Sequence, residues 1–170
     1  MLPKKLIDLL QETDESLFMT GACHVFAREV ADYFASTGYE IWCMEEEQWI
    51  IQSPGSGESK FGLRHLVHVY AKLDASLIDV RGIREEQSHR DAYEAEHRTN
   101  HGFSTSFHKT FVRRCTLEEL FTITQTESDT GPMNRNRLYL HEDFVDEATR
   151  RARALIKNSP GRFLVDSPIF

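Results

Sequence analysis

Length, composition and charge exclude several classes of protein. The chain has 170 residues, of which 40% are hydrophobic and 28% are charged. We expect one domain, residues 1–170, because a chain of this size buries a hydrophobic core without a disulfide or a metal. Its 20 lysines and arginines stand against 27 aspartates and glutamates, which gives a net charge of −7. This charge argues against a general nucleic-acid binder, which needs a basic surface.

The three cysteines, Cys23, Cys43 and Cys115, cannot all pair with one another, and none of them is part of a CxxC motif. The pattern predicts reduced thiols in a reducing compartment. The first ten residues lack the apolar core of a signal peptide, and no stretch approaches the roughly 20 apolar residues of a membrane span. We therefore expect a cytoplasmic protein that has no membrane partner.

The chain is predicted to begin with helices. Leu2, Leu6, Leu9 and Leu10 fall on one helical face. From Cys23 onwards, apolar residues recur at three- and four-residue steps, which predicts a helix over residues 22–35 that ends before glycine 38.

Short β-prone segments follow these helices. Residues 39–44 and 48–51 predict two strands, and the acidic run over residues 45–47 predicts a solvated loop between them. Residues 66–73 and 76–81 are predicted to form a hairpin around a two-residue turn.

The second half of the chain contains one strongly patterned helix. An apolar stripe runs from Phe144 to Ile156, with acidic residues early and basic residues late, which suits the helix dipole; Gly161 ends this C-terminal amphipathic helix. Helices followed by antiparallel strands and then helices indicate the α+β class.

The remaining predictions are a polar helix from Ser88 within residues 83–99, a strand over 107–115, a helix over 117–123 opened by a capping box of Thr116 and Glu119, and loops over 53–59 and 127–136.

Cys23 is the first candidate for chemistry. Its predicted place in the first turn of a helix exposes the thiol to the positive end of the helix dipole, which favours the nucleophilic thiolate. Gly21, just before it, would let a substrate approach the backbone.

The predicted hairpin supplies two partners. If Asp74 and Ala75 form the turn, Tyr70 faces Asp79 and His68 faces Arg81. His68 and Asp79 are then diagonal neighbours on one face of the sheet. An imidazole beside a carboxylate is the base-and-orienter pair of a catalytic triad.

These residues resemble a known superfamily. The segment Gly21-Ala22-Cys23-His24, which opens a helix, is similar to the nucleophile helix of papain-like and transglutaminase-like cysteine enzymes. His68-Val69-Tyr70 and Leu77-Ile78-Asp79 resemble the histidine and aspartate strands of that superfamily, and the compact spacing resembles its minimal bacterial and phage members. The resemblance covers residues 20–82, a catalytic-like core, whereas residues 83–170 match nothing and are expected to be a family-specific elaboration.

The resemblance implies a nucleophile helix packed on an antiparallel sheet, with Cys23 as nucleophile, His68 as base and Asp79 as orienter. The superfamily often carries a glutamine a few residues before the cysteine, but residues 12–22 contain none. The backbone N–H of Cys23 is one candidate oxyanion donor, and the second donor is unassigned.

The predicted function is that of a cysteine-dependent amide hydrolase acting through a thioester: a peptidase, a protein-glutamine deamidase or a transglutaminase-like enzyme. Its substrate would be a peptide or protein, and the candidate substrate-binding residues are Gly21, His24, Tyr70 and Arg81. No cofactor or metal is expected, because the pair His97 and His101 lacks a supporting motif. The alternative is a catalytically inactive papain-like fold that serves as a protein-binding module.

Overall fold

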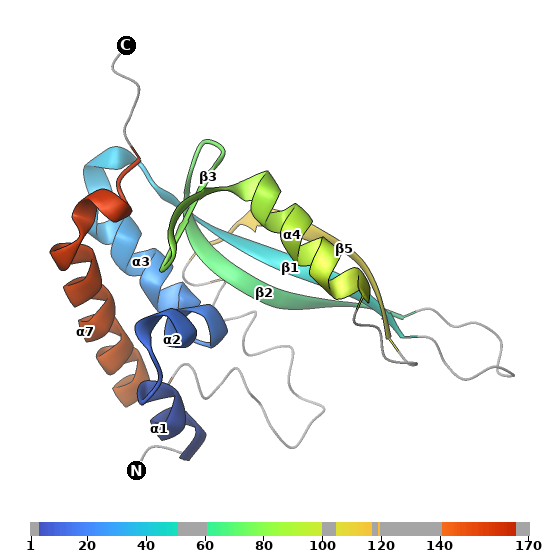
Figure 1. The fold of residues 1–170 in the computed structure, drawn as a ribbon, viewed down its shortest axis with the longest axis horizontal. Helices are drawn as coiled ribbons and strands as arrows, with labels where there is room; N and C mark the ends of the chain where they lie inside the picture. The colour runs from blue at the N-terminus through green and yellow to red at the C-terminus, as the bar shows by residue number, and fades with distance from the viewer. Residues whose placement is uncertain (1–3, 51–60, 100–104, 117–118, 120–140, 166–170) are drawn as a thin grey trace, which may run out of the picture.

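Five antiparallel strands form one sheet in the order β4-β3-β2-β1-β5, which confirms the α+β class (Figure 1). The computed structural model describes residues 4–50, 61–99, 105–116, 119 and 141–165. The strands are β1 (Glu40–Ile50), β2 (Phe61–Leu73), β3 (Ser76–Asp79), β4 (Gly82–Glu85) and β5 (Thr105–Arg114). The helices are α1 (Lys4–Leu10), α2 (Asp14–Thr20), α3 (Cys23–Tyr33), α4 (Glu86–Thr99) and α7 (Glu142–Asn158), with short 3₁₀ turns at Ala35–Thr37 and Pro160–Arg162.

The main hydrophobic core lies where α3 and α7 pack together at one end of the sheet (Figure 1). Every fourth residue of α7 is buried, from Phe144 through Ala148 and Ala152 to Ile156. This spacing places the four side chains on one face of the helix. The predicted C-terminal amphipathic helix is therefore confirmed, although it ends at Asn158, before Pro160 and Gly161.

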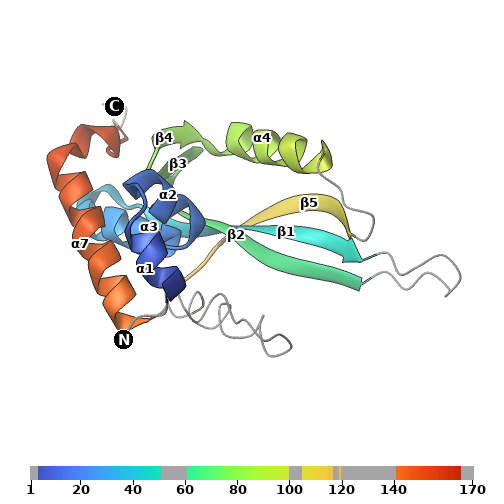
Figure 2. The same ribbon diagram turned by 60° about the horizontal axis from the view of Figure 1, so that its bottom comes forward.

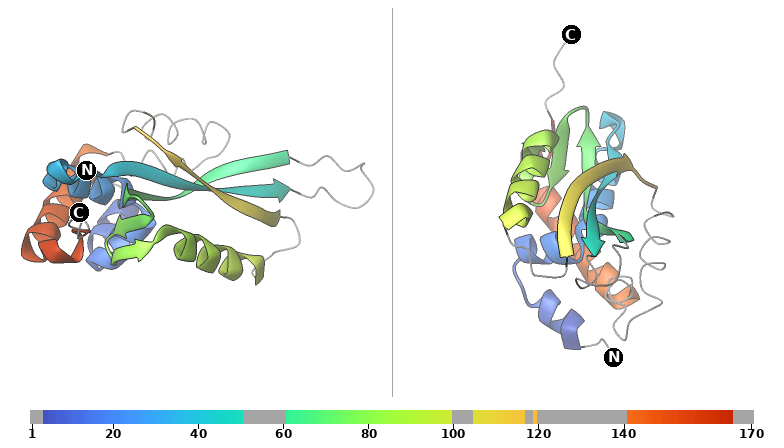
Figure 3. Two further views of the ribbon diagram at one scale, coloured as in Figure 1. Left: turned by 90° about the horizontal axis from the view of Figure 1, so that it is seen from above. Right: turned by 90° about the vertical axis from the view of Figure 1, so that its right-hand side faces the viewer.

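The sheet is covered on both faces, and each face has its own cluster of apolar side chains. Ala71 and Ile78 belong to the core shared with α3 and α7, whereas Tyr70 and Leu77 belong to a cluster that Tyr93 of α4 joins. Successive residues of a strand point to opposite faces, so α4 packs on the face opposite α3. Figure 2 shows α4 apart from the other helices, and Figure 3 shows β1 and β2 extending away from them.

The predicted hairpin register is confirmed for residues 71–73 and 76–78, but the predicted pairs of Tyr70 with Asp79 and of His68 with Arg81 do not form, because β3 ends at Asp79. Leu73 pairs with Ser76 and Ala71 with Ile78, and Asp74 takes a left-handed conformation with φ of 53° in the two-residue turn. β3 is short: it pairs with residues 71–73 of β2, and Asp79 then pairs with Gly82 at the start of β4. The part of β2 that contains His68 is therefore not paired with β3.

The prediction of a solvated loop at residues 45–47 is wrong, because β1 continues through all three glutamates. Glu45 and Glu46 are buried and have polar partners. Nε of Arg113 donates to the carboxylate of Glu45 over 3.1 Å, and the hydroxyl of Tyr93 donates to that of Glu46 over 2.7 Å. Buried carboxylates are tolerated when they are hydrogen-bonded, so the partners on β5 and α4 keep this acidic run in the sheet.

Two other predicted elements, the polar helix and the strand over 107–115, have different bounds in the structure. The polar helix begins at Glu86 rather than Ser88, and a fourth strand, β4, precedes it. The predicted strand over 107–115 is present as β5. None of the described helices is long and apolar enough to cross a membrane.

The predicted capping box is formed. The backbone N–H of Thr116 donates to the carboxylate of Glu119 over 2.8 Å, and the N–H of Glu119 donates to the hydroxyl of Thr116 over 3.1 Å. The rest of the helix predicted over 117–123 and the loops predicted over 53–59 and 127–136 lie outside the described residues.

Because Ile156 is fully buried at the α3–α7 contact, Ile156→Ala is expected to lower the free energy of unfolding by roughly 2–5 kcal/mol. Ile7→Ala is the matched control: Ile7 is exposed on α1, so its truncation is expected to change stability by no more than about 0.5 kcal/mol. Urea unfolding followed by circular dichroism measures both values, and equal losses would contradict this description of the core.

Candidate active site

Cys23 is the first residue of α3, where the helix has free backbone N–H groups. Ala22 occupies the N-cap position and makes no side-chain capping bond, and the first turn holds no acidic residue. The partial positive charge of the helix start is thus available to the half-buried Cys23 thiol.

His68 and Asp79 form a buried hydrogen-bonded pair, as predicted, although the strand pairing from which the contact was predicted ends at Ala71 and Ile78. The Nε2 atom of His68 lies 3.0 Å from a carboxylate oxygen of Asp79, and the two side chains are 2% and 3% exposed. β3 does not pair with β2 at His68, because its pairing with β2 is confined to residues 71–73.

Asp79 is the most heavily engaged group of the site. Its carboxylate accepts the backbone N–H of Arg81 over 2.8 Å and a guanidinium N–H of Arg84, in addition to the contact with His68. Burial alone would raise the pKa of Asp79, but His68 and these donors outweigh it and lower the pKa from 3.8 to about 2. The carboxylate is therefore ionised throughout the physiological range.

Cys23 and His68 shift each other's ionisation. Burial opposes a charge on either group, but the imidazoles of His24 and His68 lower the pKa of the Cys23 thiol from 9.0 to about 5. Likewise, Asp79 and Cys23 outweigh burial and raise the pKa of His68 from 6.5 to about 9. Between these values the favoured state is a thiolate beside an imidazolium. The Nδ1 atom of His68 is buried and has no hydrogen-bond partner among the described residues, so it is the ring atom left for the thiol.

Two aromatic rings hold the ring of His68 in place. Tyr70 stacks on it with ring centroids 5.9 Å apart, and His89 of α4 contacts it at 5.7 Å. Tyr70 is completely buried, and its hydroxyl donates to the carboxylate of Glu86. Tyr70 therefore packs against the ring of His68 and positions it. Because Tyr70 is completely buried, it does not contact a substrate, contrary to the prediction.

The other predicted substrate-binding residues lie close to the pair. Gly21 is buried in the turn between α2 and α3, where its N–H donates to the carbonyl of Leu17 over 3.2 Å. His24 is half-buried beside the Cys23 thiol, and its Nε2 has no partner among the described residues. Arg81 is partly exposed and contributes to a pocket.

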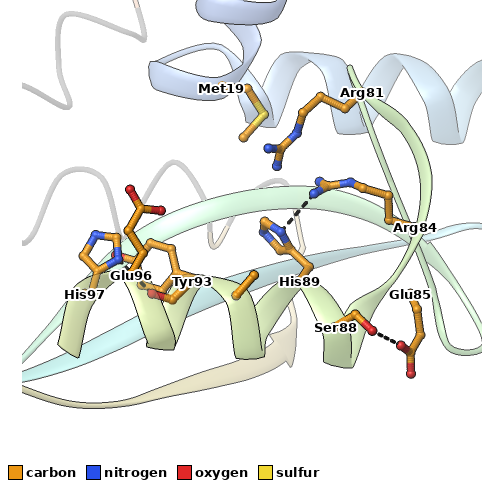
Figure 4. Close-up of a pocket in the computed structure, with 10 residues that line it drawn as sticks. Met19, Arg81, Arg84, Glu85, Ser88, His89, Tyr93, Glu96 and His97 are labelled. Atoms are coloured by element: carbon orange, nitrogen blue, oxygen red, sulfur yellow. Dashed lines mark hydrogen bonds between the residues drawn. The ribbon is translucent and has the colours of Figure 1, made fainter. Parts of the chain in front are cut away.

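This pocket, of about 610 Å³, adjoins the Asp79 side of the site and contains two residues that sequence reasoning missed, Arg84 and His89 (Figure 4). Nη1 of Arg84 lies 3.0 Å from Nδ1 of His89. Burial and the charge of Arg84 lower the pKa of His89 to about 4, so His89 is neutral and accepts this hydrogen bond. Neither residue belongs to a recognisable sequence motif. Both reach the site because β4 turns back beside β3 and leads directly into α4.

No metal site accompanies these residues: within the described ranges no group of three histidine, cysteine, aspartate or glutamate side chains is placed to hold a metal ion. Comparison with family models, curated proteins and solved structures finds no match to the chain. Only the arrangement of the side chains in the site therefore indicates its chemistry.

The low pKa of Cys23 predicts the pH dependence of alkylation. Because the pKa is lowered, the thiolate is present above about pH 5 and is lost as the pH falls through that value. Iodoacetamide is therefore expected to modify Cys23 with an inflection near pH 5. In His68→Ala the inflection moves upward, and at pH 6 the rate falls roughly tenfold or more.

Mass mapping of the modified peptide identifies the thiol that reacts. Cys43 and Cys115 serve as internal controls, because both are buried and are expected to react slowly in the native protein. A Cys23 rate with an inflection at the pH of an ordinary thiol, or one unchanged in His68→Ala, would contradict the ion pair.

The contact with Asp79 is expected to set the ionisation of His68. Removal of the negative charge in Asp79→Asn lowers the pKa of His68 from about 9, because the hydrogen bond to Asp79 is the largest of the interactions that raise it against burial. The same change leaves the guanidinium of Arg84 without its anionic partner and lowers the free energy of unfolding by roughly 3 kcal/mol.

NMR titration of the His68 ring protons measures this pKa directly. Asp143→Asn makes the same chemical change on the exposed first turn of α7 and is the control. A His68 pKa that is equal in Asp79→Asn and in the control would show that Asp79 does not stabilise the imidazolium.

Proposed function

We propose that the protein is a papain-like, cysteine-dependent amide hydrolase or acyltransferase with Cys23 as nucleophile, His68 as base and Asp79 as orienter. One observation carries the proposal: a thiol at the uncapped start of α3 lies beside an imidazole whose far nitrogen is 3.0 Å from a buried carboxylate. A nucleophile, a base and a group that orients the base are the three roles that acyl transfer requires.

The first chemical step follows from the ionised pair. The Cys23 thiolate attacks the carbonyl carbon of an amide, a C–S bond forms, and the negative charge moves to the carbonyl oxygen. The free N–H groups at the start of α3 can stabilise this oxygen, because the N-cap residue Ala22 offers no side chain to occupy them.

His68 then serves as the acid. Its imidazolium gives the Nδ1 proton to the departing nitrogen as the C–N bond breaks, which leaves a thioester on Cys23 and a neutral imidazole. In hydrolysis, the imidazole takes a proton from water while the water oxygen attacks the thioester. The C–S bond then breaks and the carboxylic acid leaves, and the proton stays on His68, which restores the thiolate and the imidazolium. Asp79 remains ionised throughout and keeps the ring in orientation.

The position of the attacked amide decides the activity. A main-chain amide would make the protein a peptidase, and a glutamine side chain would make it a deamidase, or a transglutaminase if an amine replaces water. A catalytically inactive protein-binding module is the alternative to all three.

Mass spectrometry of a proteome-derived peptide mixture separates these activities. New peptide termini identify a peptidase, a gain of about 1 Da at glutamine identifies a deamidase, and glutamine joined to an added primary amine identifies a transglutaminase. Cys23→Ala and His68→Ala are each expected to reduce turnover roughly a thousandfold or more, because members of a triad act as a unit.

Cys43→Ala is the matched control, because it removes a buried thiol that lies outside the triad. Product formation that survives in Cys23→Ala would contradict Cys23 as the nucleophile. The absence of any Cys23-dependent product from a protein whose Cys23 is reactive would favour the binding module.

A further inference from the structure

The pocket beside the triad has two chemically different ends (Figure 4). At one end the guanidinium groups of Arg81 and Arg84 lie near His89. At the other end α4 contributes Glu96 and His97, and Met19 and Ala92 are apolar parts of the lining. The cationic end adjoins the triad, since both arginines contact Asp79.

The two arginines are not equivalent. Arg84 donates to Asp79 and contacts His89 at 3.0 Å, so its guanidinium is held by the protein. Arg81 contributes its backbone N–H to Asp79 at 2.8 Å, but its guanidinium lies 3.5 Å from the same carboxylate and the side chain is 34% exposed. The backbone of Arg81 therefore serves the triad, and its side chain is available to a ligand.

The local charge balance also favours an anion. Asp79 is a single negative charge beside Arg81, Arg84 and the imidazolium of His68. The thiolate of Cys23 balances one of these cations, so these five groups at the triad end retain one positive charge. Glu96 also lines the pocket, but it lies at the other end in Figure 4. Glu85 also lines the pocket, but its carboxylate accepts the hydroxyl of Ser88 and points away from the arginines in Figure 4.

We propose that the guanidinium of Arg81 binds a carboxylate of the substrate in this pocket, which makes acidic peptides the preferred substrate class. The inference rests on the proposed function. A guanidinium is well suited to a carboxylate because it presents paired N–H donors in a plane. The chain as a whole carries a net charge of −7, so this local cationic site is what would draw an acidic segment towards Cys23.

The carboxylate can come from two sources: an acidic side chain within the peptide, or the free carboxylate at its C-terminus. Bromoacetyl tripeptide probes distinguish them, because Cys23 displaces bromide and records its rate of encounter with each probe. One set carries glutamate at the first, second or third position and a C-terminal amide. The second set is identical except for glutamine in place of glutamate. The third set has no acidic side chain and carries a free C-terminal carboxylate.

For the wild-type protein we expect at least one carboxylate probe to alkylate Cys23 about fivefold faster than its neutral match, as one partly exposed ion pair would produce. In Arg81→Gln this ratio falls to about one. Arg81→Lys retains part of the preference, because it keeps the charge and loses the planar donor pair. Addition of salt reduces the wild-type ratio.

Arg150→Gln is the matched control. It makes the same change of charge at an exposed arginine of α7 that pairs with Glu147, and it is expected to keep the wild-type ratio. Thermal unfolding of each variant verifies that it is folded, and Arg81→Lys provides the comparison if the glutamine variant is unstable.

The possible failures can be told apart. If iodoacetamide modifies Cys23 no faster than an ordinary thiol, the proposed function is overturned. If Cys23 reacts rapidly but carboxylate and neutral probes react alike, the inference about substrate class is wrong while the proposed function stands. A preference that persists in Arg81→Gln would overturn the assignment to Arg81.

Discussion

The carboxylate of Asp79 is the interaction on which the rest of the site depends. It is hydrogen-bonded to the ring of His68, and it accepts hydrogen bonds from the backbone N–H of Arg81 and the guanidinium of Arg84. Burial of a carboxylate is costly unless its lone pairs are satisfied and its charge is balanced. Here the donors satisfy it, and one anion thereby orients the imidazole and holds the β3–β4 turn and β4 beside the pocket. The site and the turn that builds it are stabilised by the same charge.

The shape of the sheet explains how a helix on one face reaches a histidine that packs towards the other. Tyr70 and His89, which contact His68, belong to the α4 side, whereas Cys23 packs with Val69 and Cys43 on the α3 side. Because β3 ends at Asp79 and pairs only with residues 71–73, the edge of β2 is unpaired by β3 at His68. The helix start and the imidazole act on the same thiol, because Cys23 is the first residue of α3 and His68 lowers its pKa.

Local rules predicted some parts of the molecule well and others poorly. The contact of His68 with Asp79 was predicted from the two-residue turn, which sets the register of Leu73 with Ser76. The paired strands end before His68, so the turn accounts for the direction of the two strands but not for the contact itself. The prediction of a loop at Glu45 and Glu46 was wrong because it rested on their local polarity. Their hydrogen-bond partners, Arg113 and Tyr93, are distant in sequence. Arg84 and His89 were missed for the same reason: nothing in their neighbouring residues marks them, and only the return of β4 beside β3 brings them to Asp79.

By itself the sequence determined that Cys23 lies in the first turn of a helix, that a two-residue turn joins β2 to β3, and that α7 has an amphipathic face, because each depends on residues within a few positions of one another. Only the tertiary structure brought the thiol and the imidazole close enough to shift each other's pKa, since they are 45 positions apart in the chain. It also decided that Tyr70 is buried behind His68 and that Arg81 opens onto a pocket. Ionisation and access depend on what surrounds a side chain in space, and packing between distant segments sets those surroundings.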